Sequence, residues 1–171
     1  MSKITPCLWF DGKAEEAAKF YVSLLPNSRI DKVMRSPADN PSTPAGAVLT
    51  VEFTLAGQPF MGLNGGPEFH FTEAVSFTIE CEDQAEVDRL WEGLVQGGGS
   101  PGPCGWLKDR FGLSWQIVPR VLPQMMSDPN REAAARVMQA MMKMGKLDIA
   151  ALMRAYEGQA GEAYGAQPEF H

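Results

Sequence analysis

The sequence has few of the residues that bind metals or nucleic acids. It contains two histidines, His70 and His171, and three cysteines without a CxxC spacing. An odd set of this kind does not form a disulfide framework, so we expect reduced thiols in a cytoplasmic protein. The 15 Lys and Arg residues are outnumbered by 21 Asp and Glu residues, which gives a net charge of -6. This balance argues against a nucleic-acid partner, because no basic stripe is present to displace counterions.

Long apolar runs are also missing. No segment reaches the length that crosses a bilayer, and the start of the chain, MSKITPCLWFDGK, lacks the apolar region of a signal peptide. We therefore expect neither a membrane partner nor export. The chain has 171 residues, of which 44% are hydrophobic, and these numbers favour one compact domain or two half-domains that share a core.

What the sequence does contain is a weak internal repeat. The segment Gly57–Leu63 aligns with Gly112–Val118, since each has a glycine, an aromatic ring three places on and an apolar end. A shift of 71 residues places Thr5-Pro6-Cys7-Leu8 on Ser76-Phe77-Thr78-Ile79. Both halves have the pattern of a strand, an amphipathic helix and further strands. We predict an α+β fold with two tandem βαβββ modules that form a curved, mostly antiparallel sheet around a concave cleft.

The expected elements follow from periodicity and from turn residues. In the first module we predict strands over 3–10, 28–36, 47–55 and 59–64, a helix over 13–25 and a mobile proline-rich loop over 37–46. In the second module we predict a strand over 74–81 and a helix that begins at the N-cap Asp83, with Glu86 in the capping-box position. That helix has a buried stripe of Val87, Leu90, Trp91 and Leu94, and Gly97–Gly99 ends it. The last strand follows the turn Asp109–Gly112.

The remaining chain has a helical pattern. Ser127-Asp128-Pro129 predicts the start of a helix over 131–144, with Val137, Met138, Met141 and Met142 on one flank, and a second helix covers 146–156. These methionines suit an adaptable interaction surface, or they pack on the core or on a twin subunit. The predicted organisation is a first module over 1–66, a second over 67–120, a helical extension over 121–157 and a flexible tail over 158–171. The two modules form one structural domain.

The blocks LWFDG, AAKFYVSLLPNS, AVSFTIEC, CGWLKD and SWQIVP resemble the vicinal oxygen chelate (glyoxalase/bleomycin resistance/dioxygenase) superfamily. Within it, the chain is most similar to the PhnB-like branch labelled 3-demethylubiquinone-9 3-methyltransferase. The resemblance covers residues 3 to 156 and implies a ligand site on the concave side of the sheet and a homodimer. The superfamily includes isomerases, dioxygenases, transferases and drug-binding proteins, so the resemblance does not fix an activity.

In metal-dependent members of this superfamily, four side chains from the first and last strands of the two modules bind the metal. The repeat places Thr5, Met61, Ser76 and Gln116 at those positions. Two hydroxyls, a thioether and an amide do not suit a divalent first-row metal, so we expect no metal. The glycines Gly97–Gly99 follow a helix, whereas the cofactor turn of a Rossmann-type methyltransferase follows a strand. We expect no cofactor.

The same four residues are the predicted ligand-binding positions, with Trp9, Phe69 and Trp106 as aromatic walls for a flat ligand. We therefore expect a metal-free protein that binds a small aromatic or amphipathic molecule. The alternative is an enzyme of the same fold acting on a small carbonyl or quinone-like substrate. Its candidate catalytic groups are Gln116, whose amide can donate and accept, Glu52 as a desolvated base, and His70. An ordinary structural role is the alternative for each of these residues.

Overall fold

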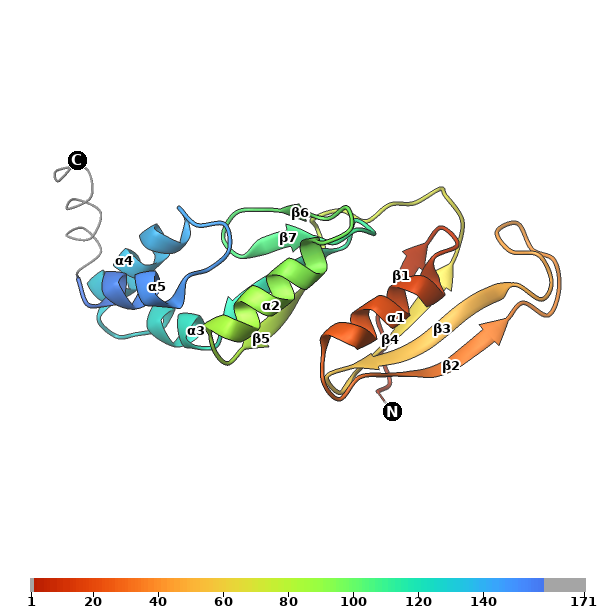
Figure 1. The fold of residues 1–171 in the computed structure, drawn as a ribbon, viewed down its shortest axis with the longest axis horizontal. Helices are drawn as coiled ribbons and strands as arrows, with labels where there is room; N and C mark the ends of the chain where they lie inside the picture. Colours follow the sequence, from red (N-terminus) through yellow and green to blue (C-terminus); the bar gives the residue numbers. More distant parts are fainter. Residues whose placement is uncertain (1, 159–171) are drawn as a thin grey trace. The chain divides into compact units, whose positions relative to one another are not determined.

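The computed structural model describes residues 2–158, and these divide between Phe71 and Thr72 into two compact units, unit 1 and unit 2. The predictions made for residues 159–171, including His171, lie outside the described residues. Unit 1 contains β1 (Cys7–Phe10), α1 (Ala14–Leu24), β2 (Arg29–Arg35), β3 (Val48–Leu55) and β4 (Gln58–Asn64). Its sheet has the order β1-β4-β3-β2, with β1 parallel to β4 and the other neighbours antiparallel. In Figure 1, α1 lies along one face of this sheet.

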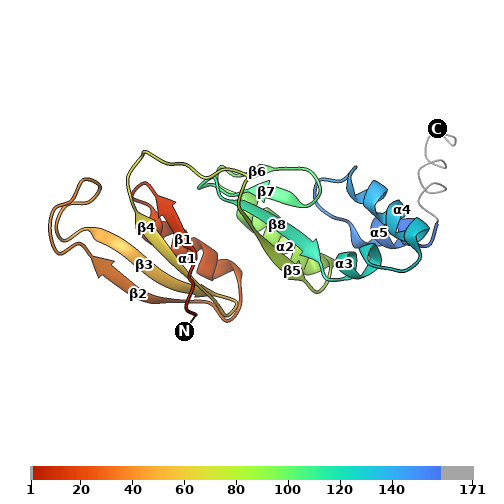
Figure 2. The same ribbon diagram turned by 180° about the vertical axis from the view of Figure 1, so that it is seen from behind.

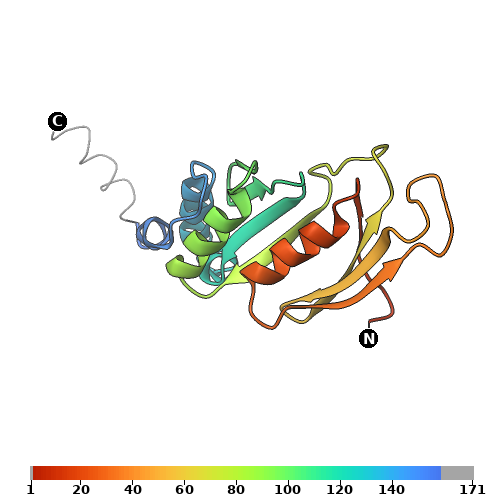
Figure 3. The ribbon, with the colours of Figure 1, turned by 45° about the vertical axis from the view of Figure 1, so that its right-hand side comes forward.

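Unit 2 repeats this plan and adds helices. It contains β5 (Ser76–Cys81), α2 (Gln84–Val95), β6 (Ser100–Pro101), β7 (Trp106–Lys108), β8 (Ser114–Pro119), α3 (Val121–Met126), α4 (Arg131–Met141) and α5 (Ile149–Tyr156). The sheet has the order β5-β8-β7-β6, with β5 parallel to β8. Figure 2 shows both sheets from behind, and Figure 3 shows them turned by 45° from the view of Figure 1. The predicted α+β class with two βαβββ motifs is confirmed.

Helix α1 packs on its sheet through small side chains. Ala14, Ala17 and Ala18 are fully buried, which lets the helix lie close to the strands. Tyr21 extends the contact, with its ring 6.2 Å from that of Phe53. The predicted helix over 13–25 is confirmed by α1. The predicted strand over 3–10 is shorter than expected, since β1 begins only at Cys7, and Ile4 before it is 82% exposed.

The start of α1 is capped from a distant strand. Lys13 provides no side-chain cap, and instead the Asn64 Oδ1 atom accepts a 2.9 Å hydrogen bond from the Ala14 amide. The Asn64 side chain is buried and also donates to the Val48 carbonyl, 2.9 Å away. One amide side chain at the end of β4 therefore ties the helix to β3. A residue 50 positions away in sequence provides the cap, so local patterns could not reveal it.

Helix α2 follows its sequence signals closely. The Asp83 carboxylate accepts from the Glu86 amide at 2.9 Å, as the predicted N-cap. The Glu86 side chain reaches back one residue further than the standard capping box and accepts from the Glu82 amide at 2.7 Å. Val87, Leu90, Trp91 and Leu94 are the buried residues of the helix, as predicted. The chain turns away after Val95, where Gly97 and Gly98 have φ angles of 80° and 117°.

The helical extension differs from its prediction in three respects. A short helix, α3, was not expected, and the cap of α4 is Asn130, whose Oδ1 atom accepts from the Ala133 amide, not the Ser127-Asp128 pair. The helix also ends earlier than predicted, at Met141, and its flank residues Met138 and Met142 are 47% and 59% exposed. Helix α4 buries Ala133, Ala134, Val137 and Ala140, and Val137 joins a core with Leu122, Met125, Leu147 and Leu152.

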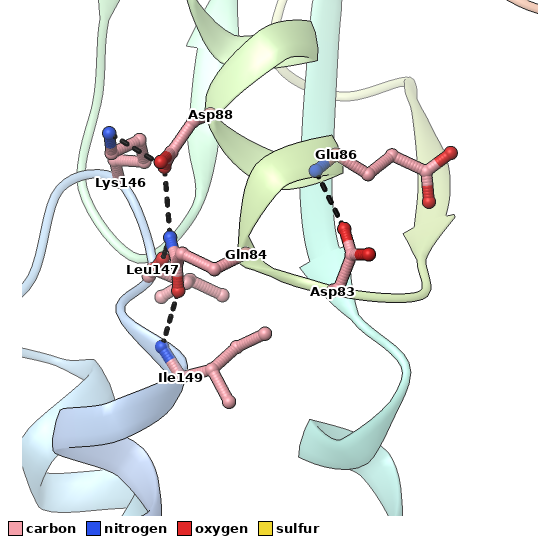
Figure 4. Close-up of polar contacts among 7 residues, drawn as sticks. All are labelled: Asp83, Gln84, Glu86, Asp88, Lys146, Leu147 and Ile149. Carbon is pink, nitrogen blue, oxygen red and sulfur yellow. Dashed lines mark hydrogen bonds and ion pairs between the residues drawn. The ribbon is translucent and has the colours of Figure 1, made fainter.

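Polar contacts fix the start of α5 against α2 (Figure 4). The Gln84 side-chain amide donates to the Leu147 carbonyl at 3.0 Å, and its oxygen accepts from the Ile149 amide at 2.7 Å. Lys146 forms a 2.8 Å ion pair with Asp88 one turn along α2. The extension is thus held by unit 2 through side chains as well as through its apolar core. Among residues 2–158, no helix is both long and apolar enough to span a membrane.

Candidate functional site

The open face of the unit 2 sheet carries two rows of side chains. Strand alternation directs Trp115 and Ile117 toward α2, so Ser114 and Gln116 lie on the opposite face. The strand register places Lys108, Ser114 and Ser76 in one row across β7, β8 and β5, and places Trp106, Gln116 and Thr78 in the next row. Neighbours in such a row are close enough to interact. Three predicted site residues, Ser76, Trp106 and Gln116, therefore lie together on this face.

Two of these residues are hydrogen-bonded to each other. The Gln116 Nε2 atom donates a 2.9 Å hydrogen bond to the Ser76 Oγ atom, across the β5–β8 pair. The corresponding positions in unit 1 have the same backbone register, since Cys7 pairs with Met61 as Thr78 pairs with Gln116. The alignment of the two halves is therefore correct. Thr5, however, lies outside β1 and is exposed, whereas its counterpart Ser76 begins β5.

The adjacent hydroxyl lacks a partner. Ser114 is 1% exposed, and its Oγ atom forms no hydrogen bond with the described residues. A buried hydroxyl without a partner costs about 1–3 kcal/mol. Most buried polar groups in native proteins are hydrogen-bonded, so this exception calls for an explanation.

A pocket of about 550 Å³ lies beside this hydroxyl. Its wall is mostly apolar and comes from β6, β7, the turn between them, the start of β8 and one residue before β5. The lining residues are Glu73, Ser100, Pro101, Gly102, Pro103, Cys104, Trp106, Leu107, Lys108 and Ser114. Cavities of 300–1,000 Å³ with apolar walls and a few polar groups are typical of small-molecule sites. This pocket belongs entirely to unit 2.

The helical extension supports one wall of the pocket. The amides of Cys104 and Gly105 donate to the carbonyls of Met144 and Gly145, each at 2.8 Å. Gly105 has a φ of 84° and leaves little room for a side chain, because Leu147 packs against its backbone. Cys104 itself is in the left-handed region, with a φ of 58°. The backbone of this wall therefore has two consecutive residues with positive φ angles, and hydrogen bonds to Met144 and Gly145, about 40 positions away, hold it in place.

One ion pair lies at the pocket. The Lys108 ammonium contacts the Glu73 carboxylate, and their side chains are 44% and 64% exposed. The hydrogen bond from Lys108 and its charge lower the pKa of Glu73. Glu73 therefore stays ionised at neutral pH and is the anion next to this lysine.

The predicted unit 1 residues form a separate group. The Trp9 indole donates to the Gly66 carbonyl at 2.8 Å, and its ring meets the Phe69 ring edge-on with centroids 4.9 Å apart. Phe69 is nonetheless 61% exposed. Met61 is half-buried and pairs in the sheet with Glu52, while His70 is exposed. The structure therefore brings Trp9 and Phe69 together, and brings Met61 beside Glu52.

The thiols differ in their surroundings. Burial raises the pKa of the Cys81 thiol to about 12, so it stays protonated at neutral pH and is a poor nucleophile. Cys104 is half-buried and lines the pocket. Cys7 is exposed, so Cys81 is the only fully buried thiol among the described residues.

The side chains at the superfamily's metal positions do not fit a metal. Thr5, Met61, Ser76 and Gln116 offer no imidazole, thiolate or carboxylate, and the Gln116 amide is engaged by Ser76. Within the part of the chain that the structure describes, no group of three His, Cys, Asp or Glu side chains could hold a metal ion. The glycines after α2 end that helix, with the Gly99 amide bonded to the Val95 carbonyl at 2.8 Å. They do not form a strand-to-helix cofactor turn.

Ser114, Lys108 and Glu73 were not selected from the sequence. Ser114 lies two residues before Gln116 on one strand, so the sequence predicts that the two side chains share a face. Lys108 is part of the CGWLKD block, which carries the family resemblance. Neither signal shows that the Ser114 hydroxyl lacks a partner, because that depends on every group that packs around it. Glu73 and Lys108 are 35 positions apart in the sequence, so no local sequence pattern indicates that they pair.

The comparisons with known proteins identify the family through a family model and one solved structure, and a second structure shows the same fold. The family model described as 3-demethylubiquinone-9 3-methyltransferase matches residues 2–118. The PhnB protein of Bacillus cereus, which bears a provisional name of that kind, is 37% identical, with a TM-score of 0.61 over 69% of this chain and 99% of its own. Protein PA1353 of Pseudomonas aeruginosa is 23% identical, with a TM-score of 0.56 over 70% of this chain and 98% of its own. No curated protein matches the chain. The match to the family ends before α3, so the helical extension lies outside it.

Proposed function

Since the chain belongs to the 3-demethylubiquinone-9 3-methyltransferase family, we propose that it is a PhnB-like protein that binds a small aromatic or amphipathic molecule without a metal. The observation that supports this proposal is the apolar pocket of unit 2, about 550 Å³ in volume, with Trp106 in its wall. A flat ring can pack against the indole while polar groups orient one end of the ligand. The wider concave cleft expected from the sequence stays a prediction.

The side chains of the catalytic alternative offer less support. Gln116 is bonded to Ser76, and His70 is exposed on the segment between the units. Glu52 lies on β3, opposite Met61 on β4 and Lys32 on β2. We therefore propose binding as the function and propose no reaction. The family is labelled a methyltransferase, but no side chain of this site indicates a methyl-transfer reaction.

A thermal-shift screen with uncharged aromatic compounds tests the proposal. We would use 1,4-naphthoquinone and 2-naphthamide, with cyclohexanecarboxamide as a non-aromatic control. A ligand at 100 times its Kd stabilises the native state by about 2.7 kcal/mol, which raises the unfolding temperature measurably. We expect stabilisation by the aromatic compounds only. If no aromatic compound raises the unfolding temperature at millimolar concentration, the proposal is wrong.

Variants locate the ligand within the protein. Trp106→Ala should abolish the stabilisation, whereas Phe69→Ala in unit 1 should leave it unchanged if the pocket of unit 2 is the whole site. An effect of Phe69→Ala would contradict the assignment of the ligand to the pocket of unit 2. Gln116→Leu tests the predicted polar positions. It should leave the fold intact and weaken binding if Ser76 and Gln116 orient the ligand, and unchanged affinity would remove both from the site.

We also propose a homodimer. The resemblance implies one, and the structure offers apolar surface for it, with Val33 and Met34 on the edge strand β2 each more than a third exposed. An edge strand has unpaired backbone groups that a second chain can use. Sedimentation equilibrium should give twice the chain mass of 18.7 kDa. A mass of one chain at micromolar concentration would contradict this expectation.

A further inference from the structure

The polar end of the unit 2 pocket has the groups that recognise an anion. Lys108 supplies a positive charge, and Ser114 lies directly opposite it in the β7–β8 register. The Ser114 hydroxyl is buried and has no partner, and Ser114 is one of the residues that line the pocket. It can donate a hydrogen bond to an oxygen atom placed there. A ligand oxygen with negative charge would receive both this hydrogen bond and the attraction of the ammonium group.

Glu73 occupies the position of such an anion in the absence of a ligand. Its carboxylate pairs with the Lys108 ammonium, but its side chain is 64% exposed and lies on the segment just before β5. Exposed ion pairs contribute little to stability, because water screens the charges. A ligand carboxylate that also accepts from Ser114 would therefore displace Glu73 at small cost.

The other end of the pocket selects the body of the ligand. Pro101, Pro103 and Trp106 form an apolar wall with limited side-chain freedom. A flat ring fits such a wall better than a flexible chain does, since a ring loses less conformational entropy on binding. The charged end and the flat wall therefore point to one class of molecule.

We propose that the ligand is an aromatic carboxylate, whose carboxyl group binds between Lys108 and Ser114 in place of Glu73 while its ring packs on Trp106. This inference rests on the proposed binding function and names its ligand class. In this arrangement Ser114 binds the ligand, and its hydroxyl lacks a hydrogen-bond partner only when no ligand is bound. Glu73 is an internal competitor that keeps the lysine paired until the ligand arrives.

Isothermal titration calorimetry with 2-naphthoate and 2-naphthamide tests the charge requirement. The two probes share their ring and differ in charge. We expect naphthoate to bind at least about tenfold more tightly, since a hydrogen bond to a charged group contributes about 1.5–3 kcal/mol. Lys108→Met should remove that advantage, whereas Lys143→Met, which replaces an exposed lysine outside the pocket, should keep it. Glu73→Gln should raise naphthoate affinity and leave naphthamide affinity unchanged.

Ser114→Ala gives a second, independent readout. The variant loses a buried hydroxyl that has no partner, so it should unfold at the same or a higher temperature than the wild type. It should at the same time bind naphthoate more weakly. A serine with a purely structural role would show the reverse, with lower stability and unchanged affinity. The unfolding temperature of the variant is measured on the unliganded protein.

The possible failures are distinguishable. Equal affinities for naphthoate and naphthamide, both dependent on Trp106, would overturn the carboxylate inference and leave the proposed binding function standing. Binding of neither probe, together with a negative aromatic screen, would overturn both. If Lys108→Met does not fold, the wild-type ratio of the two affinities and the effect of Glu73→Gln still decide the question.

Discussion

At the scale of single residues, Asp109 accepts several hydrogen bonds in the turn between β7 and β8. Its carboxylate is 2% exposed and accepts from the amides of Phe111 and Leu113 at 2.8 and 3.0 Å. The other oxygen accepts from the Trp115 indole at 2.9 Å. One buried side chain therefore shapes the turn before β8 and fixes the ring behind Ser114 and Gln116. The sequence predicted the turn but not this role.

Asp109→Ala should destabilise the fold by about 1–3 kcal/mol, because three donors would lose their acceptor inside the protein. Chemical denaturation measures the change. Asp11→Ala, which removes an exposed carboxylate after β1, is the matched control and should change stability by less than about 0.5 kcal/mol. Equal effects of the two substitutions would contradict the role assigned to Asp109.

Asp128 and Tyr156 form a pair whose strength depends on pH. The Tyr156 hydroxyl donates to the Asp128 carboxylate, which lowers the pKa of Asp128 and raises the pKa of Tyr156. The stabilisation by the carboxylate is present above its unfolded pKa, about 4, and is lost as the pH falls through its lowered folded pKa. The stabilisation by the phenol is present below about pH 10 and is lost as the pH rises through its raised folded pKa.

Tyr156→Phe should therefore lower the unfolding temperature at neutral pH, with a smaller difference from the wild type at both extremes. Thermal unfolding from pH 3 to pH 11 measures this profile. Asp128→Asn should reduce the effect of Tyr156→Phe, since the two residues act as a pair. A wild-type advantage that is constant across the range would show that the hydroxyl acts through some other contact.

At the scale of elements, the helical extension is joined to the pocket. Gln84 on α2 holds Leu147 and Ile149, and the preceding residues Met144 and Gly145 accept from the amides of Cys104 and Gly105. The segment between α4 and α5 therefore connects helix α2 to a wall of the pocket. The extension lies outside the family match, so this chain stabilises its pocket with residues that the family model does not cover.

Gln84→Ala should loosen that segment by about 1–3 kcal/mol, because the Ile149 amide and the Leu147 carbonyl lose their partner. Hydrogen exchange should quicken over residues 147–156 more than in β5 or β8. Gln139→Ala, on an exposed position of α4, is the control and should leave exchange unchanged. Protection that is the same in Gln84→Ala and the wild type would contradict the proposed docking.

At the scale of the whole molecule, two units with the same strand order and the same register carry different side chains at matching positions. Cys7 and Met61 in unit 1 correspond to Thr78 and Gln116 in unit 2. The repeated backbone thus presents one apolar and one polar version of the same surface. Among these four residues only Cys7 has a donor that divalent metals prefer, and a single thiol does not form a metal site.

Divalent metals should therefore leave the unfolding temperature of the protein unchanged. We would add Mg²⁺, Mn²⁺ and Zn²⁺ separately at millimolar concentration, and measure the metal content of the purified protein. Specific stabilisation by one cation, or stoichiometric metal in the preparation, would show that other residues form a site. The metal-free proposal would then be wrong, whereas the fold would stand.

The sequence by itself indicated the family through the resemblance of its motifs. It also determined the α+β class, the alignment of the two halves and the buried stripe of α2, because local periodicity and a repeat are visible in a single chain. Only the tertiary structure decided that Asn64 caps α1, that Gln84 holds the extension and that the Ser114 hydroxyl has no partner. Each of these depends on which distant groups meet, and local patterns indicate the face of an element without identifying its neighbours.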